Sequence, residues 1–483
     1  MVLLSCQCYA GNKLGKPINN MHVDQYMSQV VPWSSILGKS GQSSYQITVS
    51  NFGRSFVTLC PTILENKLGN IVTICVQSKI PELLIKKDAN WFLAEVDPVN
   101  LKTLAKIDLP KRHGSLSEQK KDTSGGAYFI KDDDDNVVVT TSDRVVRKYQ
   151  LAVSPTGKHS WSMTSNFDLK PYLGPECNLQ GNGYSDNCGK IIGEIYDHSG
   201  NLWFETDNGY IGYITDENEI SVKKLNDTIT KGGITVSDGN RVNIIADHKL
   251  YSFKADEHAS NENKIQLVWS HAYDTADSEQ KGGLGLGSNT SPTLFGDKHQ
   301  YVAIADRGNK NNNYQEHLLV YKEDTGELVC KTPVFQAGKS LINNSFIGYQ
   351  NSIIALNSYG DNSAASGIIG QSATPGLIRI DIKEHKRKYK CKVKWLNNNI
   401  YATATPEMSA KNKLIYVYNY KKEDKSWYLS TVNFHNGKII KSLKIGQDSV
   451  FPNKTWNNRW GIVTLLNDHA VYVGMSKGFL QIQ

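Results

Sequence analysis

A unit of four short apolar runs separated by turns recurs along this chain of 483 residues, and it restricts the possible folds more than any other feature. The runs of the clearest copy span residues 292–295, 301–305, 318–321 and 328–334. Asp324-Thr325-Gly326 forms a tight turn between its third and fourth runs. A repeat of about 40 to 60 residues is typical of β-propeller blades, whereas a β-sandwich or barrel leaves it unexplained.

Seven copies of this unit are complete, and an eighth, which starts at Trp460, ends after three runs. A blade left with three strands would expose a sheet edge, which proteins avoid. We therefore expect an N-terminal strand at residues 45–50, "YQITVS", to supply the missing outer strand. The sequence predicts an all-β, eight-bladed β-propeller, its last blade closed by this N-terminal strand. Residues 45–483 form the single propeller domain in this interpretation.

Residues 1–44 are interpreted as a truncated export-signal remnant and an N-terminal extension. The start is apolar and is followed by Cys8-Tyr9-Ala10, a small-x-small cleavage pattern, while Leu3-Leu4-Ser5-Cys6 resembles a lipoprotein box. Both patterns predict a secreted, periplasmic or envelope-associated protein, and an ordinary cytosolic start is the alternative. Export would permit disulfides. Two pairs have suitable spacing: Cys60 with Cys75, and Cys177 with Cys188.

The net charge of +7 comes from 54 Lys and Arg against 47 Asp and Glu, and the basic residues are scattered among acidic ones instead of forming a stripe. The main basic run, residues 383–394, is interpreted as a solvated outer strand, because lysines on an edge strand block unwanted pairing. We expect no nucleic-acid partner, since binding would require cations clustered on one face. No apolar run is long enough for a membrane span. A monomer is expected.

Several segments resemble a family of secreted bacterial quinoprotein-like eight-bladed β-propeller proteins that has no established activity. They include "LGSNTSPTLFGDKHQYVAIADRGN", "HLLVYKEDTGELVCKTPVFQAGKSLINNSFIG", "WYLSTVNFHNGKII" and "AVYVGMSKGFLQIQ". The resemblance extends from about Asn20 to the end of the chain, and it implies the propeller fold and export. It also raises the question of a pyrroloquinoline quinone (PQQ) cofactor. Quinoprotein dehydrogenases carry an adjacent Cys-Cys pair, which this chain lacks, so PQQ is disfavoured.

The loops between blades, and those between the second and third strands of each blade, open on one face of a propeller, where ligands usually bind. Asn, Asp and Ser are common in such loops for backbone reasons alone. Convergence on one axis and charged members that would be costly to bury make this set more informative. The candidate ligand-binding residues at this axial mouth are Asn344, Glu407, Arg459, Asp306, Arg307, Asn357, Asp207 and His248.

Carboxylates at the mouth suggest a metal hypothesis. Glu407 with Asp207, Asp247 or Asp306 would suit calcium, which prefers several carboxylate and amide oxygens. An ion pair between Glu407 and Arg459 is the simpler alternative. His248 is the one histidine expected at the mouth, so a histidine-bound iron centre is disfavoured.

Three functions remain open from the sequence. The first is an exported propeller that binds a small polar molecule, a glycan or a protein at its axial mouth. The second is a calcium-dependent hydrolase, such as a lactonase, with a metal in the central channel. The third is an envelope assembly scaffold that binds peptides at its strand edges. Neither a reaction nor a catalytic residue is identified.

Overall fold

A computed structural model describes the chain at residues 20–37, 44–50, 52, 57–78, 88–113, 124, 126, 128–174, 189–229, 233–260, 263–283, 285–360, 374–386, 388–447, 456, 458, 461–475 and 477–483. Within these residues it is an all-β propeller with seven sheets and two short 3-10 helices, η2 (Lys170–Tyr172) and η4 (Lys310–Asn312). None of the described residues forms a helix that is both long and apolar enough to cross a membrane.

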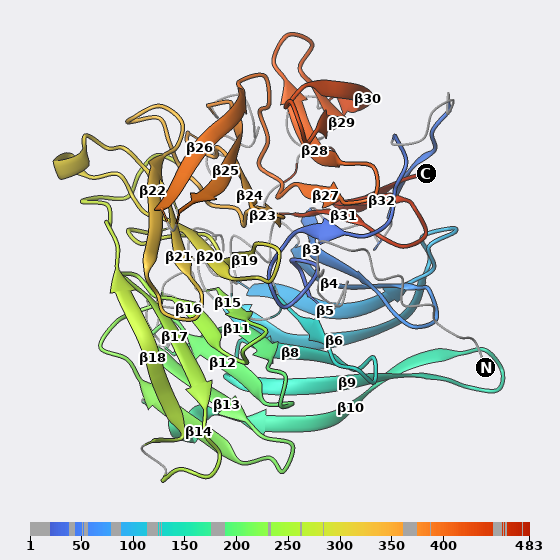
Figure 1. Cartoon of the computed structure of the whole chain (residues 1–483). Coiled ribbons are helices and arrows are strands. Elements are labelled where there is room, and N and C mark those ends of the chain that lie inside the picture. The colour runs from blue at the N-terminus through green and yellow to red at the C-terminus, as the bar shows by residue number, and fades with distance from the viewer. Residues whose placement is uncertain are drawn as a thin grey trace.

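Five of the sheets each consist of four consecutive antiparallel strands. They are β7 (Ile130–Lys131), β8 (Val137–Thr141), β9 (Val145–Val153) and β10 (His159–Asp168); β11 (Ile191–Tyr196), β12 (Leu202–Thr206), β13 (Tyr210–Ile214) and β14 (Ile220–Lys224); β15 (Ile234–Val236), β16 (Val242–Ile245), β17 (Lys249–Ala255) and β18 (Ile265–Ala272); β19 (Thr293–Phe295), β20 (Tyr301–Ala305), β21 (His317–Lys322) and β22 (Leu328–Pro333); and β23 (Ile347–Tyr349), β24 (Ser352–Leu356), β25 (Leu377–His385) and β26 (Lys388–Asn397). The first, short strands of these sheets lie near the centre of the molecule and the last strands near its periphery (Figure 1).

Two sheets are larger. One contains β27 (Glu407–Ser409), β28 (Leu414–Lys421), β29 (Ser426–Asn433) and β30 (Ile439–Gln447), to which β1 (Val30–Val31) adds in parallel beside β27. The other has eight strands: β31 (Val463–Leu465), β32 (Val471–Met475), β33 (Lys477–Ile482), β3 (Val57–Glu65), β4 (Ile71–Ser78), β5 (Asp88–Val96), β6 (Thr103–His113) and β2 (Ile47–Val49).

The closing strand is where the sequence predicts it. β2 lies antiparallel to β33, with Ile47 opposite Ile482 and Val49 opposite Leu480. Residues 47–49 and the C-terminal strand therefore share one sheet, which is the consequence expected from the three-run final copy. β3 also touches β33, but only in parallel and through two residue pairs.

The core lies between neighbouring sheets. Because successive strand residues point to opposite faces, a strand packed on both faces is apolar along most of its length. β8, "VVVTT", and β20, "YVAIA", are buried at every position. Two disulfides support this packing: the predicted bond Cys60–Cys75 joins β3 to β4, and Cys330–Cys391 joins the outer strands β22 and β26 of neighbouring sheets. Cys177 and Cys188 lie outside the described residues.

Tryptophans of two outer strands bind the next sheet along the chain. Trp269 of β18 donates its indole N–H to the carbonyl of Glu323 at 2.9 Å, and Trp395 of β26 donates to that of Phe434 at 2.8 Å. Gly326 and Gly437, at φ +71° and +70°, lie directly against these two indoles. Each tryptophan thereby packs on the turn between the third and fourth strands of the following sheet.

Residues 20–37, named here the axial segment, run along the innermost strands instead of forming a separate extension. Carbonyls of Gln25, Tyr26, Ser28 and Gln29 accept hydrogen bonds of 2.9 to 3.0 Å from backbone N–H groups of β15, β19, β23 and β27, respectively. Asn20, the first residue of the axial segment, forms a β-bridge to Ile130 of β7. This blue N-terminal ribbon crosses the middle of Figure 1. The domain boundary at residue 45 stays a prediction.

Candidate functional site

The predicted mouth residue Asn344 lies in a buried polar cluster of loops that precede innermost strands. Its Oδ1 accepts from Thr405 Oγ1 at 3.3 Å, and its Nδ2 donates to the carbonyl of Thr403 at 3.4 Å. Neighbouring Ser345 contacts His22 Nε2 of the axial segment at 3.3 Å. Residues from two sheets and the N-terminal segment thus meet near the axis, and their polar groups are satisfied largely by one another.

Asp306 and Arg307 are buried in a second network. Arg307 donates to Glu316 Oε1 at 2.7 Å and to the carbonyl of Gly287 at 2.8 Å, and both members of this ion pair are essentially inaccessible. Asp306 accepts the backbone N–H of His317 and forms an ion pair with Lys331 at 3.1 Å. These contacts fix the loop after β20.

The other predicted residues occupy separate places. Asn357 accepts the backbone N–H groups of Leu341 and Tyr359, and Asp207 accepts that of Lys190. Each side chain thereby joins its loop to the loop that precedes the first strand of the same sheet. His248 lies at the surface and contacts Asp227 at 2.8 Å. Glu407 is buried on β27, where the N–H of Leu465 donates to its Oε1 at 3.2 Å. Arg459 lies outside the described residues, so its ion pair with Glu407 stays a prediction.

The calcium hypothesis needs several oxygens around one point. Within the described part of the chain no three His, Cys, Asp or Glu residues come together in a way that could hold a metal ion. Glu407, Asp207 and Asp306 have different partners on different sheets. The described residues therefore do not fit a calcium centre built on these carboxylates.

Buried ionisable groups surround the axial segment. Burial raises the pKa of Glu205, on β12, to about 8; the backbone N–H of Gly233 opposes this rise, and the charge of Glu194 adds to it. Burial also raises the pKa of Glu194, on β11, to about 8 and that of Tyr128 to about 12. It lowers the pKa of His22 to about 3, which keeps the imidazole neutral. These four groups are therefore largely uncharged at neutral pH, whereas the buried Asp24 carboxylate accepts the N–H groups of Tyr26 and Ser28.

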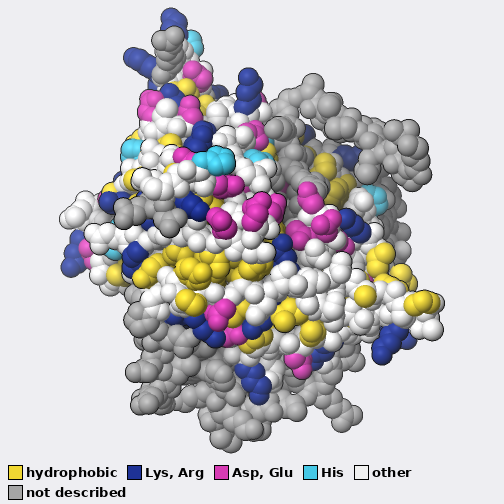
Figure 2. All heavy atoms as spheres, turned by 90° about the horizontal axis from the view of Figure 1, so that it is seen from below, with side chains coloured by type: hydrophobic (Ala, Val, Ile, Leu, Met, Phe, Trp, Pro, Cys, Tyr) yellow, Lys and Arg dark blue, Asp and Glu magenta, His cyan; other side chains and the backbone are white. Residues whose placement is uncertain are grey.

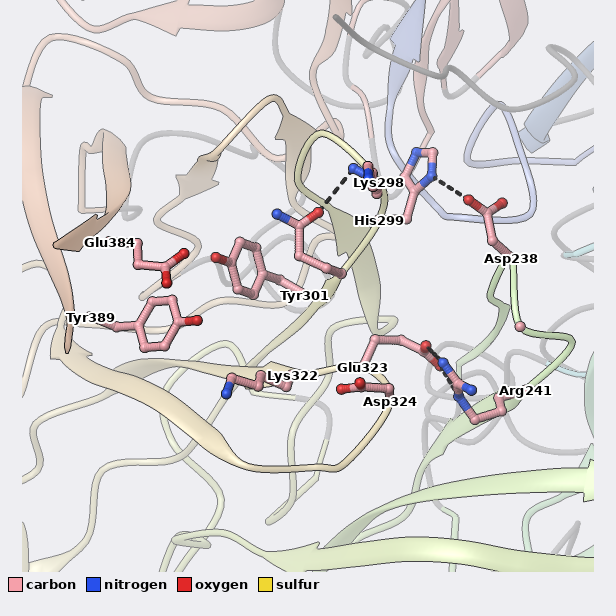
Figure 3. A pocket seen from close by; sticks show the side chains of 12 residues that line it. Asp238, Arg241, Lys298, His299, Tyr301, Lys322, Glu323, Asp324, Glu384 and Tyr389 are labelled. Carbon is pink, nitrogen blue, oxygen red and sulfur yellow. Dashed lines mark hydrogen bonds and ion pairs between the residues drawn. The ribbon is translucent and has the colours of Figure 1, made fainter. Parts of the chain in front are cut away.

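An open pocket of about 320 Å³ lies at the opposite end of the strands from the predicted mouth. Its walls are the β15–β16, β19–β20, β21–β22 and β25–β26 turns of three consecutive sheets (Figure 3). In antiparallel sheets these turns lie at the other end from the loops that form the mouth. The lining residues are Asp238, Gly239, Arg241, Lys298, His299, Gln300, Tyr301, Lys322, Glu323, Asp324, Glu384 and Tyr389.

Part of this lining is rigid. Arg241 and Glu323 form a two-point ion pair, with Nε donating to Oε1 at 2.9 Å. Tyr301 and Tyr389 meet edge to face with their ring centroids 6.3 Å apart, and Lys322 lies over the Tyr389 ring. In Figure 3 Glu384 points toward the two tyrosines, while Asp238, Arg241 and Glu323 lie on the other side of the pocket. The pocket thus combines aromatic surface with groups of both charges.

The axial segment reaches one wall of this pocket. The Tyr26 hydroxyl donates to Asp238 Oδ1 at 2.5 Å, and its ring stacks on His299 with centroids 3.7 Å apart. Burial and the Asp238 carboxylate raise the pKa of Tyr26 well above its ordinary value. Asp238 and His299 are thereby held in place by a residue more than two hundred positions earlier in the chain.

Sequence reasoning missed this pocket because it placed ligands at the other end of the strands. A usable signal was present: the turns "SDGNR", "GDKHQY", "KEDTG" and "EHKRKY" each join charged residues and, in two cases, a tyrosine. Their positions after the first or third strand of a repeat predict that they share one face. The sequence pattern does not show which neighbouring turns lie close enough together to form a pocket.

Among solved structures the chain is similar to propellers at low identity. It matches Sqt1 from Chaetomium thermophilum with a TM-score of 0.52 and 10% identity, over 90% of this chain and 97% of that one. Sqt1 from Saccharomyces cerevisiae gives 0.49 at 10% identity, over 90% and 98%. The WD40 β-propeller domain of Doa1 gives 0.37 at 10%, over 72% and 88%.

The first of these matches supports the propeller fold and nothing beyond it. No protein-family model matches the chain, and no curated protein matches it. The resemblance to quinoprotein-like propellers therefore stays a prediction.

Proposed function

We propose that this protein is an exported, eight-bladed propeller that binds a small polyhydroxy ligand, such as the end of a glycan, in the pocket formed by the turns around Tyr301 and Tyr389. The observation that carries the proposal is the composition of the pocket wall. The ring of Tyr389, which is partly exposed, can bind the apolar C–H surface of a sugar, and Tyr301, only 5% exposed, supports that ring from behind. Carboxylate, amide and ammonium groups of the pocket would bind the hydroxyls of the sugar.

The pocket is a better candidate than the predicted mouth. At the mouth, the Asn344 amide is already bonded to neighbouring loops. In the pocket, Glu384 and Asp324 are exposed, and no ion pair or side-chain hydrogen bond joins either carboxylate to another described residue. Ligand hydroxyls would replace only water there, at little cost.

The mixture of positive and negative groups in the pocket restricts the kind of ligand that it can bind. Arg241 and Glu323 neutralise each other, and Lys298 and Lys322 balance Asp324 and Glu384. Asp238, which accepts the Tyr26 hydroxyl, leaves the lining with one net negative charge. A strongly anionic or cationic small molecule would meet like charges on one side of the pocket. A neutral or zwitterionic polyhydroxy ligand fits this balance best.

Export is proposed from the chain start and the disulfides. The bonds Cys60–Cys75 and Cys330–Cys391 favour an oxidising compartment.

Eight blades are proposed because the eight-stranded sheet divides naturally in two. β31, β32, β33 and β2 form one antiparallel set of four strands, β3 to β6 form another, and only the short parallel contact of β3 with β33 joins them. Each set then matches the four-strand unit of the other sheets.

Saturation-transfer NMR with a panel of neutral mono- and disaccharides tests the binding proposal. We expect at least one sugar to show contacts with aromatic protons, and Tyr389→Ala to weaken its binding about tenfold or more. Tyr172→Ala, at an exposed tyrosine of η2 outside the pocket, is the matched control and should bind as the parent does. Sugar binding that Tyr389→Ala leaves unchanged would exclude this pocket.

A further inference from the structure

The positive charge of this protein is concentrated in one region. Residues 377–447, which include β25 to β30, hold sixteen Lys and Arg against five Asp and Glu. This stretch alone carries +11, while the whole chain carries +7, so the rest of the chain is net acidic. The sequence interpretation that the two charge signs are interspersed is therefore wrong for this part of the molecule.

The lysines of the β25–β26 hairpin share one face. Pairs directly opposite in this ladder are Lys383 with Lys390, and His385 with Lys388. Lys392 follows on the same face opposite Asp381, which is bonded to Arg379 and Ser352. The alternate positions, Tyr389 and Cys391, point the other way, toward the pocket and the disulfide to β22. The lysine face is defined here as Lys383, His385, Lys388, Lys390 and Lys392; all five are exposed.

This arrangement is unfavourable for the free protein. Like charges directly opposite on antiparallel strands have Cβ atoms about 5 Å apart and destabilise the pair. Elsewhere lysines lie beside acids, as Lys322 does with Glu327 at 2.6 Å and Lys331 with Asp274 at 2.5 Å. Within the described residues, no ion pair or side-chain hydrogen bond is found for any lysine of the lysine face. An external anion would relieve this repulsion.

Protection of a sheet edge accounts for lysines on outer strands only in part. The outer strands β10 and β18 hold equivalent edge positions without a single lysine, and β6, β14 and β30 have two lysines each. β26 has four within ten residues. On the face of the molecule shown in Figure 2, Lys and Arg side chains lie mostly among acidic ones and are densest at its projecting upper edge.

We propose that the lysine face binds a linear anionic glycan, a polymer with repeated sulfate or carboxylate groups. Alternate lysines on an extended strand repeat about every 6.6 Å, which forms a row of point charges for an extended polyanion. The face has no aromatic ring to stack on bases, because Tyr389 points the other way, and no apolar side chain to enter a bilayer. This inference does not depend on sugar binding in the pocket.

Isothermal titration calorimetry with heparin and polygalacturonate tests the proposal on the full chain. The variant K388E/K390E/K392E should bind each polymer at least about tenfold more weakly, and its affinity should depend less steeply on salt. The matched control K102E/K158E/K254E changes net charge equally at exposed lysines of other sheets and should retain near-parent affinity. Circular dichroism and thermal melting confirm that each variant is folded.

Three results would overturn the proposal: no binding of either glycan by the parent protein, equal weakening in the control variant, or tighter binding of a DNA duplex or of phosphatidylglycerol vesicles at the same ionic strength. Tyr389→Ala separates the two proposals, because it should weaken sugar binding in the pocket and leave heparin affinity unchanged. Loss of sugar binding alone would thus leave the lysine face intact as a glycan site.

Discussion

The buried residue Glu205 makes the stability of this fold depend on pH. It lies on β12 with its carboxylate 0% exposed, and neither oxygen has a hydrogen-bond partner of good geometry among the described residues. A buried carboxyl group is most stable in its protonated form when, as here, the nearby Gly233 N–H does not compensate for the loss of water. The elevated pKa of about 8 expresses this preference.

The raised pKa of Glu205 determines whether the stability of the fold rises or falls with pH. The folded protein holds the Glu205 proton up to about pH 8, whereas an unfolded glutamate releases it near pH 4.5. Its contribution is therefore complete below pH 4.5 and is lost as pH rises toward 8. We predict that Glu205→Gln, which cannot ionise, is more stable than the parent above pH 8, by on the order of 5 kcal/mol, and nearly equal to it at pH 4.5.

Urea unfolding at a series of pH values measures this difference. His22, whose pKa is lowered to about 3, has the opposite pH dependence below pH 6.5, but it is common to both proteins and cancels in the comparison. Glu217→Gln, at an exposed position in the β13–β14 turn, should leave the curve unchanged. Parallel pH profiles for Glu205→Gln and the parent would contradict the buried, protonated state.

At the scale of elements, the sequence predicts the order of the strands but not the packing contacts between neighbouring sheets. The run at 301–305 is β20 as predicted, and the closing strand pairs where the incomplete last copy requires it. Alternation and turn residues are local signals, so one sequence contains them. Contacts such as Trp395 on Gly437 join segments about forty residues apart and depend on how two sheets pack, which no local pattern records.

The contact between Trp395 and Gly437 gives the prediction at this scale. A Cβ at Gly437 would lie 2.6 Å from the indole, and φ there is +70°. We predict that Gly437→Ala lowers the free energy of unfolding by about 2 to 4 kcal/mol, from backbone strain together with displacement of the indole. Chemical denaturation followed by tryptophan fluorescence measures it.

The variant Gly157→Ala distinguishes backbone strain from displacement of the indole. Gly157 has a similar φ of +77°, but nothing lies within 4 Å of its added Cβ. Gly157→Ala should therefore lose only the backbone part, about 1 kcal/mol. Equal losses in the two variants would show that the contact between Trp395 and the next sheet contributes nothing.

At the scale of the whole molecule, the axial segment differs from the N-terminal extension that the sequence predicts. Its residues lack the four-strand pattern, so the sequence predicts an N-terminal extension and a mouth open to solvent. Tyr26, Ser28 and Gln29 are nevertheless bonded to the innermost strands of three different sheets. A segment that pairs with many sheets by single backbone bonds has no periodicity of its own. The pocket escaped prediction for a related reason, since its walls belong to three sheets.

Because the axial segment touches most of the ring, its removal should weaken the whole propeller and not one sheet. We predict that a chain beginning at residue 38 unfolds at a lower urea concentration and in a less cooperative transition, since buried N–H groups of β15, β19, β23 and β27 lose their acceptors. A synthetic peptide of residues 19–37, added in trans, should raise the melting temperature of the shortened chain in proportion to the logarithm of its concentration. A scrambled peptide of the same composition is the control. If the shortened chain melts as the parent does, or if both peptides stabilise it equally, the axial segment does not hold the ring together.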